Sequence, residues 1–248
     1  MILIFYALRR ELGGVRKRIG NRAALGDGLR GFQGRLGGEN VALVATGIGI
    51  TQARESARRA LQILPQPTLV VSTGVAGGLA PDLKAGDLVM ADRLLIESES
   101  GNYEDAAEIA PGAIQLARHA LERRGLKAAA GPMLTARRVL ANTAAKRDAY
   151  ARCGALAVDM ESAAIAIEMG QGAPPLVCIR AIIDEAGDEI PGAELAGESG
   201  EVSPLKAAAY FIRNPSALMQ VPAILKNLRL AATSIAAALE ALCSGAKS

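Results

Sequence analysis

Short, nearly continuous apolar runs alternate along this chain with longer segments in which apolar residues recur at helical spacing. Such runs are typical of strands covered on both faces, and the longer segments are typical of amphipathic helices. The runs predict strands at Met1–Leu8, Val41–Thr46, Thr68–Thr73, Leu88–Ile96, Ala128–Leu134, Ala155–Met160 and Leu176–Ile183. The amphipathic segments predict helices at Arg10–Arg18, Thr51–Leu64, Ala113–Arg124, Thr143–Arg152 and Glu161–Met169. The alternation indicates an α/β protein, which we expect to form a three-layer αβα sandwich with a mixed, largely parallel central sheet.

The predicted helix at Thr51–Leu64 has a recognisable beginning, because Thr51 is a candidate N-cap and Glu55 follows close behind it. This arrangement is a loose relative of the capping box.

The last part of the chain predicts two further helices, at Ser203–Ile212 and from about Pro222 to Leu242. In the second, Lys226 and Arg229 lie between apolar residues at helical spacing, namely Leu225, Leu228, Ile235, Leu239 and Leu242. The simplest interpretation is a terminal helix packed on the sheet. The alternative is a basic amphipathic surface that touches a membrane or a lipid substrate. We therefore expect one main domain at residues 1–200 and a helical extension at residues 201–248 packed on it.

Composition supports a folded soluble protein, since 50% of the 248 residues are hydrophobic, 21% are charged and 3% are aromatic. The apolar run at Met1–Leu8 follows no basic segment, so we interpret it as a buried strand and not as a signal peptide. No stretch approaches the length of a membrane-spanning helix, and we expect a cytoplasmic protein. The net charge of +3 is concentrated at the two ends, without the dense basic run and interleaved aromatics that nucleic-acid binding favours.

Cysteine and histidine are too few for most metal sites. The three cysteines, Cys153, Cys178 and Cys243, form no CxxC motif, and His119 is the only histidine. A disulfide scaffold, a multi-histidine metal site and a histidine-dependent nucleophile are therefore disfavoured. We expect no metal and no organic cofactor, and any acid–base chemistry falls mainly to carboxylates.

Polar residues and glycines gather where predicted strands end. They occupy the segments Leu8–Glu11, Gly47–Gly49, Thr73–Gly78, Val158–Ser162 and Arg180–Asp184. In open α/β sheets ligands bind outside the carboxyl ends of strands, so these segments are expected to converge on one pocket. Glycine turns there would let backbone N–H groups approach an anion or a sugar.

Each of these residues also has a purely structural explanation. Glu161 suits the positive end of a helix dipole, and Asp184 suits a cap at a strand end. Arg9 and Arg10 are compatible with a solvated helix start, and Met160 with the core.

Taken together, the segments resemble a known family. The motifs are TGVAGGLAPDLKAGDLV (Thr73–Val89), VALVATGIG (Val41–Gly49), AVDMESAAIA (Ala157–Ala166) and IRAIIDEAGD (Ile179–Asp188). They resemble the purine nucleoside phosphorylase/uridine phosphorylase superfamily over roughly residues 1–190, in particular the 5′-methylthioadenosine/S-adenosylhomocysteine nucleosidases. The C-terminal tail is more similar to the hopanoid-associated phosphorylases, a branch thought to remove adenine from adenosylhopane.

The resemblance implies a role for each matching residue. Asp184 would act as the general acid toward purine N7, and Glu11 falls where nucleosidases keep the carboxylate that activates water. Glu161 would accept hydrogen bonds from the ribose hydroxyls, with Met160 packed against the sugar and Arg180 nearby. The base would lie between Val139 and Leu140. A phosphate or backbone anion site would comprise Gly47, Gly49, Thr73, Gly74, Arg9 and Arg10.

The chemistry explains why carboxylates are needed. Cleavage of an N-glycosidic bond builds positive charge on the ribose and negative charge on the base, so one carboxylate stabilises the sugar and an acid protonates the base. Asp184 must therefore lie in a desolvated pocket that raises its pKa. Arg180, on the same predicted strand, would oppose that shift.

Three departures from the family pattern make the predicted pocket more apolar and alter its polar contacts. Val75 and Ile183 stand where serines are usual, and Thr135–Arg137 replaces the usual Ser-Gly-Asp. We expect cleavage of an adenine-type nucleoside with a hydrophobic 5′ substituent, with inorganic phosphate as co-substrate. The alternatives are a hydrolytic methylthioadenosine/S-adenosylhomocysteine-type nucleosidase, a futalosine-type hydrolase and a nucleoside-binding protein without catalysis. The family resemblance implies a homodimer or larger homo-oligomer, and the C-terminal helix would allow contact with the inner membrane face.

Overall fold

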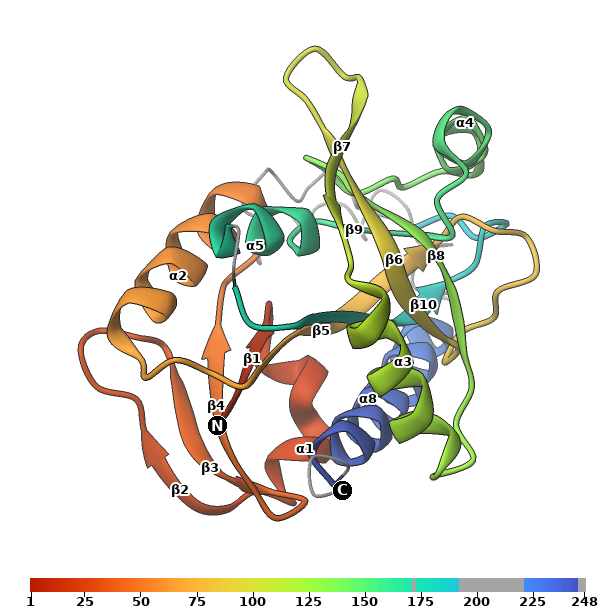
Figure 1. The fold of residues 1–248 in the computed structure, drawn as a ribbon. Coiled ribbons are helices and arrows are strands. Elements are labelled where there is room, and N and C mark those ends of the chain that lie inside the picture. The colour runs from red at the N-terminus through yellow and green to blue at the C-terminus, as the bar shows by residue number, and fades with distance from the viewer. Residues whose placement is uncertain (171–172, 192–220, 245–248) are drawn as a thin grey trace, which may run out of the picture.

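The computed structural model describes residues 1–170, 173–191 and 221–244 (Figure 1). Its strands are β1 (Ile2–Tyr6), β2 (Gly20–Ala24), β3 (Gly31–Leu36), β4 (Glu39–Ala45), β5 (Leu69–Gly78), β6 (Leu88–Glu97), β7 (Tyr103–Glu108), β8 (Ala128–Thr135), β9 (Ala157–Asp159) and β10 (Leu176–Asp184). Its helices are the 3-10 helix η1 (Arg9–Leu12), α1 (Gly13–Arg16), α2 (Ile50–Ile63), α3 (Pro111–Glu122), α4 (Thr143–Cys153), α5 (Ser162–Met169) and α8 (Val221–Ser244). The predicted helix at Ser203–Ile212 lies outside the described residues.

The strands form one mixed sheet in the order β10-β6-β8-β9-β5-β1-β4-β3-β2, with β7 paired to β6. Parallel pairs join β1 to β4 and β5, β5 to β10, and β8 to β6 and β9. Because β10 pairs with both β5 and β6, the strands β5, β10, β6, β8 and β9 close into a ring. The predicted α/β class with a mixed sheet covered by helices is confirmed.

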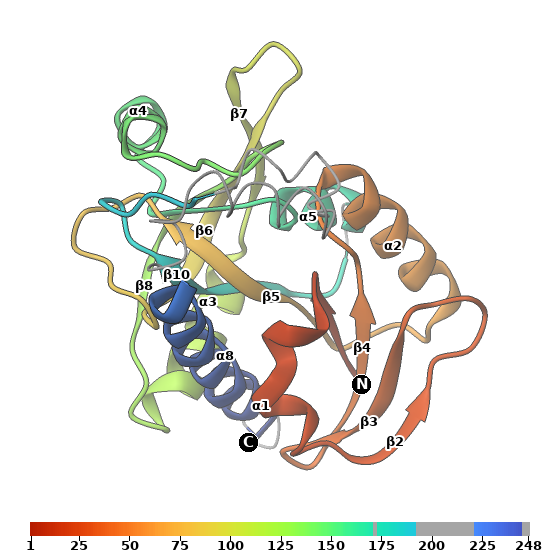
Figure 2. The ribbon, with the colours of Figure 1, turned by 180° about the vertical axis from the view of Figure 1, so that it is seen from behind.

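Alternation along β1 divides the core into two layers. Ile2, Ile4 and Tyr6 face the side covered by α1, α3 and α8, whereas Leu3 and Phe5 face α2 and α5 (Figures 1 and 2). The face of α2 that packs on the sheet is built from alanines, at 53, 57 and 60, which lets the helix approach closely. A strand buried on both faces explains the continuous apolar run at the start of the chain.

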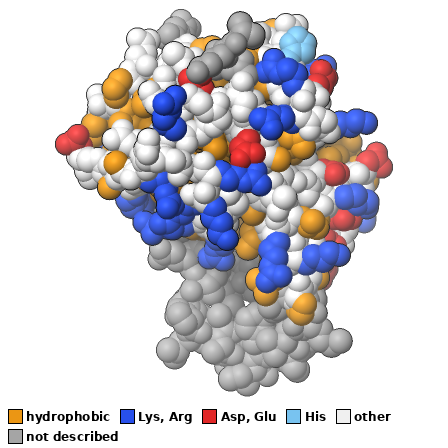
Figure 3. Space-filling model, turned by 90° about the horizontal axis from the view of Figure 1, so that it is seen from below, with side chains coloured by type: hydrophobic (Ala, Val, Ile, Leu, Met, Phe, Trp, Pro, Cys, Tyr) orange, Lys and Arg blue, Asp and Glu red, His pale blue; other side chains and the backbone are white. Residues whose placement is uncertain are grey.

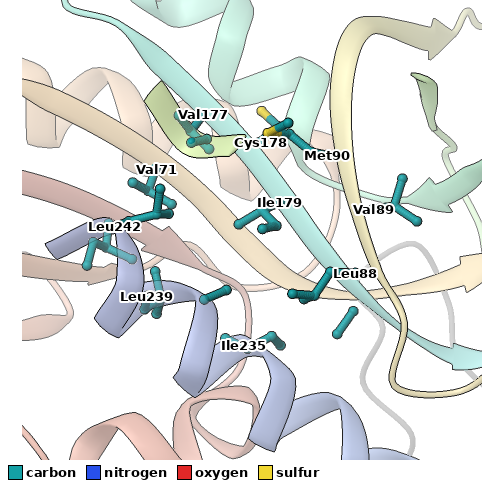
Figure 4. Packing of buried hydrophobic residues seen from close by; sticks show 14 of the residues in the cluster. Val71, Leu88, Val89, Met90, Val177, Cys178, Ile179, Ile235, Leu239 and Leu242 are labelled. Carbon is teal, nitrogen blue, oxygen red and sulfur yellow. The ribbon is translucent and has the colours of Figure 1, made fainter. Parts of the chain in front are cut away.

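The terminal helix α8 packs against the sheet over most of its length. Ile235, Leu239 and Leu242 are buried against strand residues that include Val71 and Ile179 (Figure 4). The helix also contacts η1, α1 and α3. Its first turns differ, because Ile224, Leu225 and Leu230 are exposed. The division at residue 200 stays a prediction, since that boundary lies outside the described residues.

Several local predictions need correction. The strands β2, β3 and β7 were not predicted, because they carry polar and small residues and, apart from Leu36, are exposed or only partly buried. Helix α2 begins at Ile50 with Gly49 as its N-cap, so Thr51 lies inside the helix and does not cap it. The predicted helix at Arg10–Arg18 is divided between η1 and α1.

The glycine-rich segment at Thr73–Gly78 is not a turn but the continuation of β5. It pairs with β10 on one side and with β9 at Gly77 and Gly78. Because β10 pairs with the segment along its length and β9 joins at its end, the chain runs extended here, and the glycines serve close approach of side chains and not chain reversal.

The described part of the chain contains no helix that is both long enough and apolar enough to span a membrane.

Candidate active site

The three carboxylates singled out in the sequence line one cavity of about 250 Å³. Glu11 reaches it from η1, Glu161 from the residue before α5, and Asp184 from the end of β10. Apolar residues complete much of the wall, and they include Ile48, Val75, Val139, Leu140, Met160 and Ile183. The structure thus gathers segments more than 170 residues apart in the sequence around one small, largely apolar space.

Glu11 is held by the backbone turn that precedes it. Its Oε2 accepts the N–H groups of Ala7 at 3.1 Å and of Leu8 at 2.9 Å, and only 3% of the residue is exposed. Burial raises the pKa of Glu11, while these N–H groups and the charge of Arg180 oppose the rise. A buried carboxylate with raised proton affinity is suited to accept a proton from water.

Glu161 is fixed from the opposite wall. Its Oε1 accepts the Gly49 N–H at 3.0 Å, and its Oε2 lies 3.8 Å from Arg180 Nη2. Gly49 adopts a φ of 93°, a conformation that favours glycine and turns its N–H toward the carboxylate. Burial raises the pKa of Glu161, Arg180 lowers it and the charge of Asp159 adds to the rise.

Arg180 lies behind the cavity wall and is 1% exposed. Its Nη2 forms an ion pair with Asp159 Oδ2 at 2.7 Å and donates to the hydroxyls of Ser162 and Ser72. A Cβ on Gly74 would overlap Arg180 Nη1, which explains a glycine in the middle of β5. Arg180 therefore compensates the charge of the acidic residues Asp159 and Glu161 beside the predicted sugar site without lining the cavity itself.

Asp159 is a buried residue of the site that sequence reasoning missed. Its Oδ1 accepts the Thr135 hydroxyl at 2.7 Å, and its carboxylate accepts the N–H groups of Glu161 and Ser162. It thereby fixes the first turn of α5 and the position of Glu161. The only signal in the sequence was its place two residues before Glu161, in a motif whose resemblance drew attention to Met160 and Glu161.

The cation beside Asp184 is Lys146 and not Arg180. Lys146 Nζ lies 2.5 Å from Asp184 Oδ2, and the lysine is fully buried. A register shift in β10 between Ile182 and Asp184 separates the face of Asp184 from that of Arg180. Burial raises the pKa of Asp184, Lys146 lowers it and Asp188 adds to the rise. Sequence reasoning missed Lys146 because its helix, α4, has no pronounced amphipathic pattern and exposes most of its charged residues.

The structure does not bring the six predicted anion-site residues together. Arg10 lines a different cavity, beside α8, and Arg9 lines a third cavity of about 600 Å³ with Arg16 and Arg22. Lys and Arg side chains are frequent on the face seen in Figure 3. The Gly49 N–H is already occupied by Glu161, as described above.

The remaining members, Gly47, Thr73 and Gly74, also stand outside the wall of the carboxylate cavity. Thr73 is buried, and Gly47 packs against Gln52 and Arg30. In this structure the glycines shape the chain around Glu161 and Arg180.

A second cavity, of about 860 Å³, adjoins the first. The two share the wall residues Leu8, Glu11, Val75, Ile183, Asp184 and Ile190. Beyond them the second cavity extends along the start of α8, where Ala223, Ile224 and Leu228 line it.

Among the described residues no cluster of His, Cys, Asp and Glu is arranged to hold a metal ion. His119 is exposed on α3, and the three cysteines are free.

Fold and site together define an α/β enzyme whose cavity is walled by acidic and apolar side chains. A family model described as "Phosphorylase superfamily" matches residues 3–210. The 5′-methylthioadenosine/S-adenosylhomocysteine nucleosidase of Anoxybacillus flavithermus (strain DSM 21510 / WK1) is 32% identical over 206 residues, which cover 76% of this chain and 87% of that protein. The chain belongs to the phosphorylase superfamily, and the prediction of an enzyme of the nucleoside phosphorylase or nucleosidase kind is confirmed.

Solved structures show the same fold at lower identity. The 5′-methylthioadenosine/S-adenosylhomocysteine nucleosidase of Neisseria meningitidis, in complex with methylthio-immucillin-A, superposes with a TM-score of 0.75 at 22% identity over 98% of each chain. The futalosine hydrolase of Helicobacter pylori superposes with a TM-score of 0.69 at 19% identity, covering 96% of this chain and 97% of that one.

Proposed function

We propose that this protein hydrolyses the N-glycosidic bond of an adenine-type nucleoside with a 5′ substituent, a substrate of the methylthioadenosine kind. The observation that carries the proposal is the convergence of Glu11, Glu161 and Asp184 on one cavity of about 250 Å³. Family membership and the curated nucleosidase relative support the same reaction.

Each carboxyl group has a task in this reaction. Glu161, as a carboxylate, accepts hydrogen bonds from the ribose hydroxyls and stabilises positive charge on the sugar. Protonated Asp184 gives its proton to N7 as the bond between C1′ and N9 breaks and its electron pair moves to the base. Water then forms the new bond to C1′, and its proton passes to Glu11. Adenine and a 5′-substituted ribose leave, and one proton must return from Glu11 to Asp184 through solvent.

Water fits this site better than phosphate as the acceptor. A phosphate dianion would enter a cavity whose wall, among the described residues, holds four acidic residues, Glu11, Asp159, Glu161 and Asp184, against one cation, Arg138, so repulsion by like charge dominates. The arginines expected to bind it, Arg9 and Arg10, line other cavities. The phosphorolytic expectation therefore gives way to the hydrolytic alternative.

The substrate we propose carries an apolar group at its 5′ position. The adjoining cavity of about 860 Å³ provides the volume, and Ile183, Ile190, Ile224 and Leu228 provide apolar walls. The sequence departures Val75 and Ile183 line both cavities, which supports an apolar 5′ substituent, as in adenosylhopane, over a polar one.

The direct test is adenine release from adenosine, methylthioadenosine and a 5′-alkyl adenosine, each with and without phosphate. We expect release without phosphate and, in ¹⁸O-labelled water, one labelled oxygen in the ribose product. Release that requires phosphate and yields ribose 1-phosphate would contradict hydrolysis. Tight binding of all three nucleosides without release would favour a non-catalytic binding protein.

Contact with a membrane surface rests on a different observation. Ile224, Leu225 and Leu230 are exposed on the first turns of α8, beside Lys226 and Arg229. Removal of the helix cannot test this, because its later turns belong to the core. Co-sedimentation with anionic vesicles should fall for the Leu225→Ser, Leu230→Ser double variant, and equal partitioning with the wild type would exclude the contact.

A homodimer or larger assembly, checked by analytical ultracentrifugation, stays part of the proposal.

A further inference from the structure

We propose that Lys146 is a positioning residue for this reaction, whose ammonium group holds the Asp184 carboxyl group and the loop after it in the arrangement that proton transfer to the base requires. The inference rests on the proposed function, because Asp184 has this task only if the protein cleaves a purine nucleoside.

The ammonium group of Lys146 has a complete set of partners. It lies 2.5 Å from Asp184 Oδ2 and donates to the backbone carbonyls of Glu185 at 2.7 Å and of Asp188 at 3.0 Å. An ammonium group has three N–H donors, and here it faces three oxygens, two carbonyls as hydrogen-bond acceptors and one carboxylate as an ion-pair partner. Lysine is almost never fully buried unless it is paired in this way. The group therefore ties Asp184 to the loop that follows β10.

Helix α4 is anchored so that Lys146 keeps this position. The Asn142 side chain accepts the Ala145 N–H at 2.8 Å, and Gly154 ends the helix in a left-handed conformation. The Ile190 N–H donates to the Ala141 carbonyl at 2.8 Å, which joins the same loop to the start of α4 a second time. Two attachments thus align the helix with residues 184–190.

These contacts also select which oxygen of Asp184 meets the substrate. Oδ2 is buried against Lys146, and a Cβ built on Gly77 would lie 3.0 Å from it. Asp184 nevertheless lines the cavity, which leaves Oδ1 as the oxygen that can face a bound base. A carboxyl group held by one oxygen is preorganised for proton transfer by the other.

The charges around Asp184 give Lys146 a second effect. Asp188 faces Asp184 from the following loop, and Glu11 and Glu161 line the same cavity. Arg138 also lines this cavity and Arg10 lines the adjoining one, whereas Lys146 contacts the Asp184 carboxyl group directly. Glu185 points away and pairs with Lys84 at 2.8 Å. Burial raises the pKa of Asp184 and Lys146 lowers it. Without Lys146 the Asp184 carboxyl group would keep its proton to higher pH and would release it less readily to the purine base.

The test compares pH profiles of kcat/KM for adenine release by the wild type, Lys146→Met and Lys146→Arg. We expect Lys146→Met to lower kcat by about 100-fold, the scale of a misplaced catalytic group, and to move the alkaline limb to higher pH. Lys146→Arg keeps the positive charge, so the alkaline limb of its pH profile should lie near that of the wild type, while its kcat falls. Arg147→Met is the matched control, because Arg147 is the exposed next residue of α4, and its profile should not change.

A lower kcat with an unmoved alkaline limb in Lys146→Met would overturn the proposal, since lost packing alone lowers activity without moving the limb. If Lys146→Met does not fold, Lys146→Gln replaces it in a double-mutant cycle with Asp184→Asn. We then expect Lys146→Gln to lower kcat/KM much less in the Asp184→Asn background than in the wild type. Additive losses of kcat/KM would refute the coupling between Lys146 and Asp184. Absence of adenine release by the wild type would contradict the proposed function itself, and adenine binding would still report whether the Lys146 variants disturb the site.

Discussion

At the scale of residues, the site is built from carboxyl groups whose burial works against their own ionisation. Burial is the largest cause of the raised pKa of Glu11, Glu161 and Asp184. Each raised pKa means that the ionised carboxylate is less stable in the folded protein than in water. The arrangement is therefore costly for folding and useful for chemistry, because it raises the proton affinity of the groups that must hold or accept a proton.

Replacement of Glu11 tests this cost. Glu11→Gln keeps an oxygen that can accept the two backbone N–H groups, and it removes the buried charge. Because the pKa of Glu11 is raised in the folded protein, the protonated form of Glu11 favours folding. This contribution to stability is complete below the ordinary pKa of 4.5, and it is lost as the pH rises through the raised pKa and the buried carboxyl group ionises. The variant should therefore melt higher than the wild type at pH 7, by about 2–4 °C per kcal/mol gained, and show little gain near pH 4. It should also lose hydrolysis; a lower melting temperature at pH 7 would contradict this account.

Gly74 tests the packing beneath the site. Its φ is 150°, and a Cβ there would overlap Arg180 Nη1 and approach Glu11. Gly74→Ala should lower the free energy of unfolding by at least about 1–3 kcal/mol, measured by urea denaturation. Gly112→Ala in α3 is the control, because nothing lies within 4 Å of its Cβ, and it should stabilise by about 0.5–1 kcal/mol. Equal effects of the two substitutions would refute the role of Gly74.

At the scale of elements, hydrophobic pattern predicted what is buried and failed where strands are exposed. The apolar runs located β1, β4, β6, β8, β9 and β10 to within a few residues. The exposed β2 carries no apolar alternation, so its pairing with β3 was invisible in the sequence. The sequence motifs also located three residues of the site, Glu11, Glu161 and Asp184. They did not locate Lys146 and Asp159, because these two act through contacts that only the tertiary structure creates.

The burial of α8 gives a prediction at this scale. Leu239 is fully buried in the larger core cluster, whereas Leu225 is 49% exposed on the same helix. Leu239→Ala should therefore cost about 2–5 kcal/mol of unfolding free energy, the usual loss for a leucine deleted from a core. Leu225→Ala should cost less than about 0.5 kcal/mol. Similar losses in urea denaturation would mean that α8 packs differently.

At the scale of the whole molecule, the two adjoining cavities combine a fixed cleavage site with a wider apolar space. Their shared wall contains Glu11 and Asp184, and the wider space extends to α8. The terminal helix thereby forms part of the core and part of the proposed binding site for the 5′ group. A sequence alone could suggest the apolar helix, but not that its first turns would reach the cavity.

A series of 5′-alkylthio adenosines measures what this space binds. Each added CH₂ that leaves water gains at most about 0.8 kcal/mol, so kcat/KM should rise by up to about fourfold per CH₂ until the space is filled. Ile224→Ser with Leu228→Ser should flatten the series and leave methylthioadenosine cleavage nearly unchanged. A series that is flat in the wild type would remove the apolar 5′ group from the proposal.

The central claim is that three carboxyl groups act on one sugar–base linkage, and a crystal structure with methylthio-immucillin-A tests it most directly. We predict the sugar hydroxyls within hydrogen-bond distance of Glu161, the purine N7 position beside Asp184, and a water molecule between Glu11 and the carbon that represents C1′. An analogue that occupies another cavity, or that leaves any of the three carboxyl groups without a contact to the ligand or to that water, would contradict the claim.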